Sequence, residues 1–349
     1  MVNTQCYGTT PDGREVKIFT LRNAGGLTAR VTEIGASLVS CEVPDRHGRF
    51  ADVTLGYDTA EGWLGNSAYL GATVGRFANR IRDGKFSIDG TLLQLATNNA
   101  PGGIPCHLHG GVKGFDKVLW QGEVVGESVM FRYRSVDGEE GYPGNLDVEV
   151  TYSLNDQNEL TWQARATTDA PTIINLVHHT YWNLTGDPTR SILDHELRLE
   201  ADHFLPTDAG LIPSGEQRSV AGTALDFRSM RRIDERIEEE EEALHLAGGY
   251  DHCWILRECE GLRVAAVLAD PSSGRRMELR TDQPAIQFYS GNFLDGTIRG
   301  KNGIVYGHRS GLCLETENFP DAPNQPSFPH TILRPGEIYQ HRMIHRFSF

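Results

Sequence analysis

The chain has 349 residues, 39% of them hydrophobic and 23% charged, which predicts one folded domain over residues 1–349 and excludes an intrinsically disordered protein. Its formal net charge of −14 is opposite to that of the basic surfaces that bind nucleic acid or anionic membranes, so neither is an expected partner. No apolar run approaches the roughly 20 residues that a membrane-spanning helix needs.

The N-terminal segment and the cysteines bear on the compartment. The first residues, MVNTQCYGTTPDGREVKIF, contain no basic start followed by an apolar region, so no signal peptide is predicted. The six cysteines are scattered and form no Cys-x-x-Cys pair. Reduced thiols in a cytoplasmic protein are therefore expected.

Alternating apolar and polar residues, the pattern of half-buried strands, recur along the chain. In KFSIDGTLLQL, residues 85–95, Asp89 and Gly90 lie between two short strand-like runs, which is a strong hairpin signal. Further strand and hairpin patterns cover residues 27–44, 129–138, 145–168 and 262–281.

A clear helical pattern occurs only at residues 226–246, which contain five consecutive glutamates. Such a run of like charge repels itself, so a solvated face or loop is expected there and not a metal site. The many short strands and the 38 glycines predict an all-β fold: one large antiparallel β-sandwich with a few short helices.

The segment GRFANRIRDG, residues 75–84, carries the first groups suited to a ligand. It contains no phosphate-binding glycine motif. Asn79 and Arg80 could supply fixed donors to a hydroxyl-rich ligand. Taken alone, the segment is more typical of surface arginines.

The segment HLHGGVKGFDKVLW, residues 107–120, begins with a His-x-His pair. On one strand His107 and His109 would point to the same face. A metal site would need a carboxylate soon after them, but Lys113 and Gly114 occupy those positions. Hydrogen bonding to a polar ligand, or a structural role, is therefore favoured over metal binding.

The segment NLVHHTYWNL, residues 175–184, contains two adjacent histidines. Strand alternation places His178 on the face of Trp182 and places His179 on the face of Tyr181. The second face, with imidazole and phenol together, is the better wall for a polar pocket. A buried structural histidine is an equally good interpretation at this point.

Two later segments supply carboxylates. GGYDHCW, residues 248–254, places Asp251 after a glycine turn, where it could accept hydrogen bonds from hydroxyl groups. LCLETENFPDAPNQPSFP, residues 312–329, places Glu315 and Glu317 after an apolar run. The spacing alone does not show which of the two is the functional carboxylate. A carboxylate, an imidazole and several hydroxyl-binding groups indicate proton transfer on a neutral polar substrate.

Four motifs together resemble the aldose 1-epimerase, or galactose mutarotase, family: GRFANRI, LHGGVKGFDKVLW, HHTYWNL and LETENFPDAPN. They occur in the family's order, and the resemblance runs from about residue 12 to the C-terminus. It implies a galactose mutarotase-like supersandwich without a cofactor. It also implies interconversion of the α and β anomers of free aldohexoses such as galactose and glucose.

The resemblance also implies roles for individual residues. Glu315 and His179 match the family's catalytic pair. The substrate-binding positions match Asn79, Arg80, His109, Tyr181, Asp251 and Gln287. The family usually has asparagine where this chain has His178, and because alternation turns that side chain away from the sugar, the change is expected to affect packing and not the reaction.

Mutarotation removes a proton from the C1 hydroxyl and delivers one to the ring oxygen, so it needs a base and an acid on opposite sides of the anomeric centre. With a reference pKa of about 4.3, Glu315 is expected to be ionised and to act as the base. His179 is expected to act as the acid, and a nearby carboxylate would help it to hold its proton.

Three alternatives remain open. A hexose-6-phosphate 1-epimerase would share the fold but needs a cationic pocket. A non-catalytic sugar-binding module could use the same fold, and a metal-dependent β-fold enzyme is the third. The expected partner is a monosaccharide, and the sequence leaves monomer and homodimer equally open.

Overall fold

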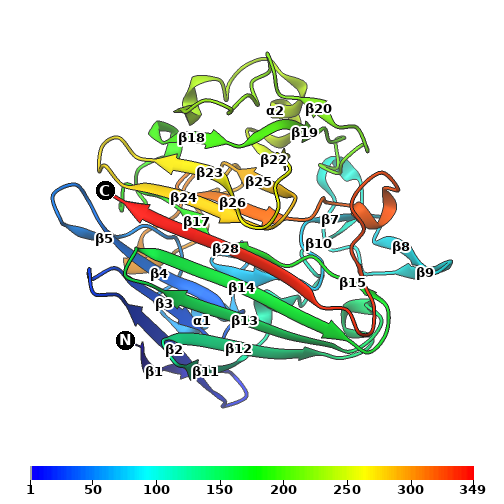
Figure 1. Ribbon diagram of the computed structural model, residues 1–349, viewed down its shortest axis with the longest axis horizontal. Helices are drawn as coiled ribbons and strands as arrows, with labels where there is room; N and C mark the ends of the chain where they lie inside the picture. The colour runs from blue at the N-terminus through cyan, green and yellow to red at the C-terminus, as the bar shows by residue number, and fades with distance from the viewer. Residues whose placement is uncertain (1) are drawn as a thin grey trace.

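The computed structural model describes residues 2–349, which form strands and loops with two short α-helices (Figure 1). The neighbouring strands of its three large sheets all pair antiparallel. The predicted all-β antiparallel fold is therefore confirmed.

The largest sheet has nine strands, and the C-terminal strand runs through its middle, between β14 and β24 (Figure 1). Its order is β11 (Gln121–Val125), β12 (Ser128–Ser135), β13 (Leu146–Leu154), β14 (Glu159–Thr168), β28 (Tyr339–Ser348), β24 (Arg276–Thr281), β23 (Arg263–Ala269), β18 (Glu196–Leu199) and β21 (Arg231–Arg232).

Two further sheets complete the main layers. The six-stranded sheet has the order β17 (Tyr181–Trp182), β26 (Leu312–Glu317), β25 (Ala285–Tyr289), β22 (Asp251–Leu256), β19 (Ala201–Leu205) and β20 (Arg218–Ser219). The five-stranded sheet comprises β1 (Val2–Thr9), β2 (Glu15–Arg22), β3 (Thr28–Thr32), β4 (Ser37–Pro44) and β5 (Phe50–Asp52).

Small elements connect these sheets. Four two-stranded ladders pair β6 (Ala72–Val74) with β16 (Val177–His179), β7 (Arg80–Arg82) with β10 (Cys106–Leu108), β8 (Lys85–Ile88) with β9 (Thr91–Gln94), and β15 (Thr172–Ile173) with β27 (Ile332–Leu333). The α-helices are α1 (Ala60–Leu64) and α2 (Glu242–Ala247). Short 3-10 turns cover Pro101–Gly103, Phe115–Lys117, Glu139–Gly141, Ile192–Asp194, Ile233–Glu235, Lys301–Gly303 and Ala322–Asn324.

The core forms because strand alternation sends apolar residues to one face. In β13, Leu146, Val148, Val150 and Tyr152 are buried, whereas the residues between them are exposed or half-buried. They join one hydrophobic cluster that contains residues from all three large sheets. Burying this apolar surface is the main stabilising contribution to the fold.

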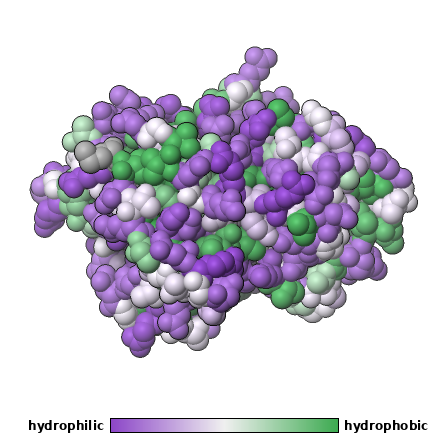
Figure 2. Space-filling view, turned by 90° about the horizontal axis from the view of Figure 1, so that it is seen from below, coloured by the Kyte–Doolittle hydropathy of each residue, from purple (hydrophilic) through white to green (hydrophobic). Residues whose placement is uncertain are grey.

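The hairpin predicted at residues 85–95 is confirmed as β8 and β9. Its turn residues Asp89 and Gly90 have φ values of 50° and 81°, which suit aspartate and glycine. The face of the molecule seen in Figure 2 is mostly hydrophilic, with apolar residues in small groups. None of the helices in residues 2–349 is long and apolar enough to cross a membrane.

The helical pattern at residues 226–246 forms an α-helix only near its end. Within that range β21 pairs with β18 at the edge of the large sheet, and only α2 is α-helical. Phe227, Ile233 and Ile237 are buried separately in the core, so tertiary packing overrides the local pattern. The glutamate run from 238 to 242 is mostly exposed, as predicted.

Candidate active site

The structure brings the candidate residues of all the predicted segments to one cavity with a volume of about 570 Å³, which lies within the size range of small-molecule sites. These residues come from distant parts of the chain. The lining includes Asn79, Arg80, His109, His179, Tyr181, Asp251, Gln287 and Glu315.

Three neighbouring strands of the six-stranded sheet supply the carboxylates and the amide. Glu315 on β26 lies opposite Gln287 on β25 in the antiparallel register. The Gln287 amide donates a 2.7 Å hydrogen bond from Nε2 to Oδ1 of Asp251, at the start of β22. Gln287 Oε1 has no partner among the described residues, so it is an acceptor available to a ligand hydroxyl.

The two adjacent histidines face opposite sides, as alternation predicts. The structure divides the segment into β16 and β17, with Thr180 between them. The His179 ring lies 5.3 Å from the Tyr181 ring and lines the cavity. The His178 ring instead stacks on buried Trp162 at 5.8 Å and an interplanar angle of 23°.

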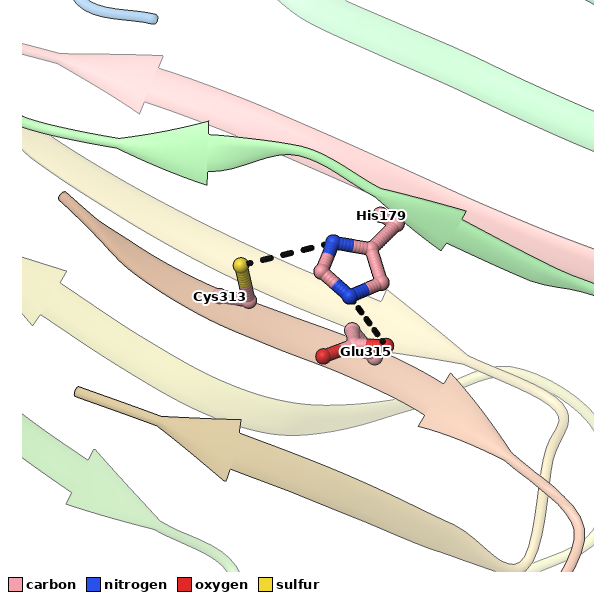
Figure 3. Close-up of side chains that lie close together, drawn as sticks. All are labelled: His179, Cys313 and Glu315. Atoms are coloured by element: carbon pink, nitrogen blue, oxygen red, sulfur yellow. Dashed lines mark hydrogen bonds and ion pairs between the residues drawn. The ribbon is translucent and has the colours of Figure 1, made fainter. Parts of the chain in front are cut away.

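His179 lies between a carboxylate and a thiol. Its Nε2 is 3.6 Å from Oε2 of Glu315, and its Nδ1 is 3.7 Å from Sγ of Cys313 (Figure 3). Although ligand atoms of the three side chains all lie within 4.8 Å of one another, these two contacts use opposite nitrogens of the ring. The arrangement therefore suits an oriented imidazole better than three ligands converging on one ion.

Two hydrogen bonds join His109 and Asn79, and one of them uses the His109 ring. The Asn79 N–H donates to His109 Nδ1 at 3.1 Å, and the His109 N–H donates to the Asn79 carbonyl at 3.1 Å. Because Nδ1 accepts, the ring proton is on Nε2, which can donate to a ligand. Both residues have left-handed backbones, with φ of 51° at His109 and 62° at Asn79.

The expectation that His107 and His109 share a face is wrong. Strand β10 ends at Leu108, and the positive φ of His109 breaks the alternation. His107 is fully buried and its Nε2 lies 2.7 Å from the hydroxyl oxygen of Tyr142. It is a structural histidine and is not among the residues that line the cavity.

Burial shifts the proton affinities of the central pair. Desolvation lowers the pKa of His179 to about 4 and raises the pKa of Glu315 well above its usual range, with Glu317 and Asp251 adding to the latter shift. Burial therefore opposes the ionised Glu315 expected from the reference value, because that value assumes a solvated carboxyl group. Desolvation thus favours the neutral forms of both side chains.

Several residues of the site escaped the sequence-based prediction. Tyr69 packs its ring 4.6 Å from that of His109 and 5.7 Å from that of His179, and no pattern marked it. Phe293 lines the cavity and is 62% exposed. Cys313 could have been found from alternation, since it lies two residues before Glu315 on the same face of β26.

The fold and the cavity together define an antiparallel β-sandwich protein with a buried imidazole–carboxyl pair in the lining of a cavity. The family described as aldose 1-epimerase matches residues 17–346. The chain therefore belongs to the aldose 1-epimerase family.

Individual relatives agree over nearly the whole chain. Galactose mutarotase from Homo sapiens is 45% identical over 348 residues, covering 99% of this chain and 98% of the relative. Aldose 1-epimerase from Escherichia coli (strain K12) is 38% identical over 344 residues, covering 97% and 96%.

Solved structures show the same fold. An aldose epimerase homologue from C. elegans aligns with a TM-score of 0.87 at 33% identity, covering 94% of this chain and 98% of that one. Galactose 1-epimerase from Lactobacillus acidophilus aligns with a TM-score of 0.86 at 30% identity, covering 100% and 98%.

Proposed function

We propose that this protein interconverts the α and β anomers of free aldohexoses, with galactose and glucose as the expected substrates. The observation that carries the proposal is the contact of 3.6 Å between His179 Nε2 and Glu315 Oε2, both of which line the cavity. A base and an acid this close together can act on the C1 hydroxyl and the ring oxygen of one sugar, because both oxygens are bonded to C1. Family membership and the named relatives support the same activity.

The proposed reaction uses one proton shared by the pair. In the reacting form the shared proton is on His179 and Glu315 is ionised. Glu315 then takes the proton of the C1 hydroxyl while His179 delivers its proton to the ring oxygen, and the C1–O5 bond breaks to give the aldehyde. The proton from the sugar is then on Glu315, and His179 is neutral. Rotation about C1–C2 exposes the other carbonyl face, and the reverse transfers close the ring.

Other cavity residues are proposed to hold the sugar hydroxyls. Arg80 and His109 present donors, Asp251 and Gln287 present acceptors, and Tyr181 flanks His179. Fixing the hydroxyls keeps C1 and O5 at the catalytic pair while the ring is open. Asn79 is the sixth proposed sugar-binding residue. The sugar-binding group is therefore Asn79, Arg80, His109, Tyr181, Asp251 and Gln287.

The charge of the lining favours a free sugar over a sugar phosphate. Of the described residues that line the cavity, Arg80 is the one lysine or arginine, while Asp251, Asp295 and Glu315 are acidic residues. A phosphate group would need a stronger cationic surface. The hexose-6-phosphate alternative is therefore the weaker candidate.

We also propose that residues 1–349 act as a single domain, since one hydrophobic cluster contains residues from Phe19 to Phe347. A cytoplasmic location fits the six cysteines, all of which are free thiols. Light scattering after size-exclusion chromatography would decide between a monomer and a homodimer.

Polarimetry of freshly dissolved aldoses, with exchange of the anomeric proton by NMR, tests the activity. The protein should accelerate anomer exchange of glucose and galactose in proportion to its concentration, and glucose 6-phosphate much less. EDTA should leave the rate unchanged, and an EDTA-sensitive rate would favour the metal-dependent alternative. Sugar binding without faster exchange would contradict the proposed activity and favour the non-catalytic module.

A further inference from the structure

A second carboxyl group lies behind the catalytic one. Glu317 follows Glu315 by two residues on β26, so strand alternation places both on the same face. Glu317 is fully buried, whereas Glu315 lines the cavity. The reaction proposed above uses Glu315 and leaves Glu317 without a role.

Glu317 makes one direct contact with the sugar-binding group. The Asn79 side chain donates from Nδ2 to Glu317 Oε1 at 3.1 Å. The other carboxyl oxygen, Oε2, is buried and has no hydrogen-bond partner in the described part of the chain. A buried carboxylate with one oxygen unpartnered is costly unless it carries a proton.

The surrounding charges also disfavour an ionised Glu317. Asp251 and Glu315 are the acidic neighbours, and Arg80 is the cationic one. Cys253 and Tyr339 are further titratable groups whose pKa values the charge of Glu317 raises. Burial, the largest cause, raises the pKa of Glu317 to about 8 despite the opposing effect of the Asn79 and Asn175 amides.

Asn79 transmits this contact to the cleft. Its Oδ1 accepts a 2.9 Å hydrogen bond from the Arg80 backbone N–H, so both ends of its amide are occupied within the protein. Its own backbone pairs with His109 in both directions. A contact that fixes the Asn79 side chain therefore also fixes the positions of Arg80 and His109 in the cleft.

We propose that Glu317 is a positioning residue of the sugar site: a neutral, buried carboxyl group that anchors Asn79 and, through it, Arg80 and His109. This inference rests on the proposed function for its role in catalysis. Neutrality serves a second purpose, because a charged Glu317 would oppose ionisation of Glu315 when it acts as the base.

Two variants of the whole protein separate the parts of the proposal. Glu317→Gln keeps an uncharged oxygen acceptor for Asn79, whereas Glu317→Leu fills similar space and leaves Asn79 Nδ2 unpaired. Exposed Glu258→Gln is the matched control for removal of a carboxyl group. Each is assayed for kcat, KM and thermal unfolding at pH 5 and pH 8.

Glu317→Leu should lower kcat/KM by about tenfold or more, mainly through KM, and Glu317→Gln should recover most of that loss. The Tm of Glu317→Gln relative to the natural protein should rise from pH 5 to pH 8, because the unfolded carboxyl ionises while the folded one retains its proton. Glu258→Gln should show neither effect.

Equal damage from Gln and Leu would overturn the neutral-acceptor role, and so would a Tm difference that is the same at both pH values. The pH-dependent Tm needs no activity, and galactose titration calorimetry reports the positioning of Arg80 and His109 without turnover. If the natural protein fails to exchange anomers, the proposed function fails while these two measurements still decide the inference.

Discussion

At the residue scale, two adjacent histidines have different environments. His178 lies among aromatic rings of the core, with Trp162, Tyr152 and His345 within 6 Å between ring centroids. Its Nε2 lies 3.0 Å from the Thr180 hydroxyl. His179 faces the cleft and Glu315. His178, which stands where the family usually has asparagine, therefore packs in the core on the side away from the cavity.

Substitution should separate the two histidines. His179→Asn and Glu315→Gln should each lower kcat by about 10²–10⁴-fold, because each removes one proton-transfer group. His178→Asn should lower the Tm and leave the turnover per folded molecule within a few fold of the natural value. Polarimetry and circular dichroism melts measure both quantities. Full activity in His179→Asn together with loss in His178→Asn would reverse the assignment.

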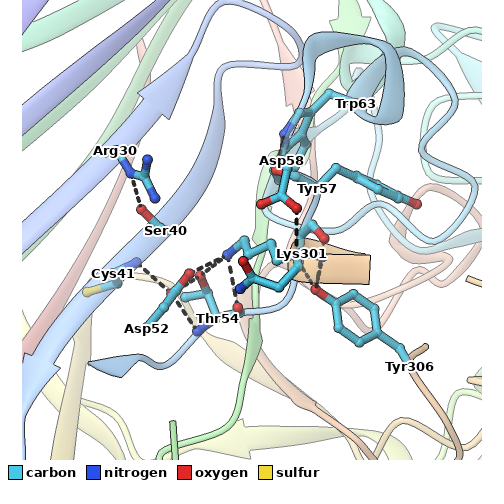
Figure 4. Close-up of polar contacts among 12 residues, drawn as sticks. Arg30, Ser40, Cys41, Asp52, Thr54, Tyr57, Asp58, Trp63, Lys301 and Tyr306 are labelled. Atoms are coloured by element: carbon cyan, nitrogen blue, oxygen red, sulfur yellow. Dashed lines mark hydrogen bonds and ion pairs between the residues drawn. The ribbon is translucent and has the colours of Figure 1, made fainter. Parts of the chain in front are cut away.

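At the scale of elements, the segment between β25 and β26 forms one wall of the cleft. Its residues Phe293 to Ile298 contribute much of this lining. The segment is anchored by buried Lys301, whose Nζ donates to Asp52 Oδ2 at 2.7 Å, Thr54 O at 2.9 Å and Thr54 Oγ1 at 3.0 Å (Figure 4). All three ammonium protons therefore have hydrogen-bond acceptors. The contact with Asp52 links this wall of the cleft to β5.

Removing this anchor should destabilise the wall. Lys301→Met leaves Asp52 and Thr54 without their cation, and the free energy of unfolding should fall by about 2–4 kcal/mol. KM should rise because the cleft wall loosens. Urea unfolding of this variant is compared with Lys85→Met, at an exposed position of β8. Equal stabilities of the two variants would show that the buried ion pair contributes nothing.

At the scale of the whole molecule, many histidines are buried in neutral form. Desolvation is the first cause in each case and lowers their pKa to about 4; the residues are His179, His195, His252, His341 and His345. Both ring nitrogens of His345 lack partners among the described residues. Protonating such a ring in the core is unfavourable.

Stability should therefore fall in mild acid. Between the unfolded value of 6.5 and the folded value of about 4, the unfolded chain binds more protons, so the free energy of unfolding decreases as the pH falls through that range. Each unit of pKa difference contributes about 1.4 kcal/mol. Urea unfolding from pH 7 to pH 4.5 measures the slope.

Histidine variants identify the source of the slope. His345→Leu should reduce the slope of the free energy of unfolding against pH by the contribution of one histidine. His203→Asn, at an exposed position, should leave that slope unchanged. Buried Glu315 and Glu317, whose pKa values are raised, contribute a slope of the opposite sign, so the comparison between variants is the test. Equal slopes for His345→Leu and the natural protein would contradict the assignment of a neutral buried His345.

Local sequence patterns determined the strand-rich class, the hairpin at Asp89 and Gly90, and the opposite faces of His178 and His179. Period-two alternation and turn chemistry are properties of adjacent residues, so they can be read without the fold. Family resemblance selected Glu315 from the two carboxyl groups on one face, and its catalytic role remains a prediction.

Tertiary structure decided what depends on distant residues. It limited the helical pattern at 226–246 to a short α-helix that follows a strand, and the left-handed backbone of His109 separated it from His107. It also placed Asn79 against Glu317, although 238 positions separate them in the chain. The shifts in proton affinity belong here as well, because desolvation arises only when residues distant in the sequence enclose the same side chain.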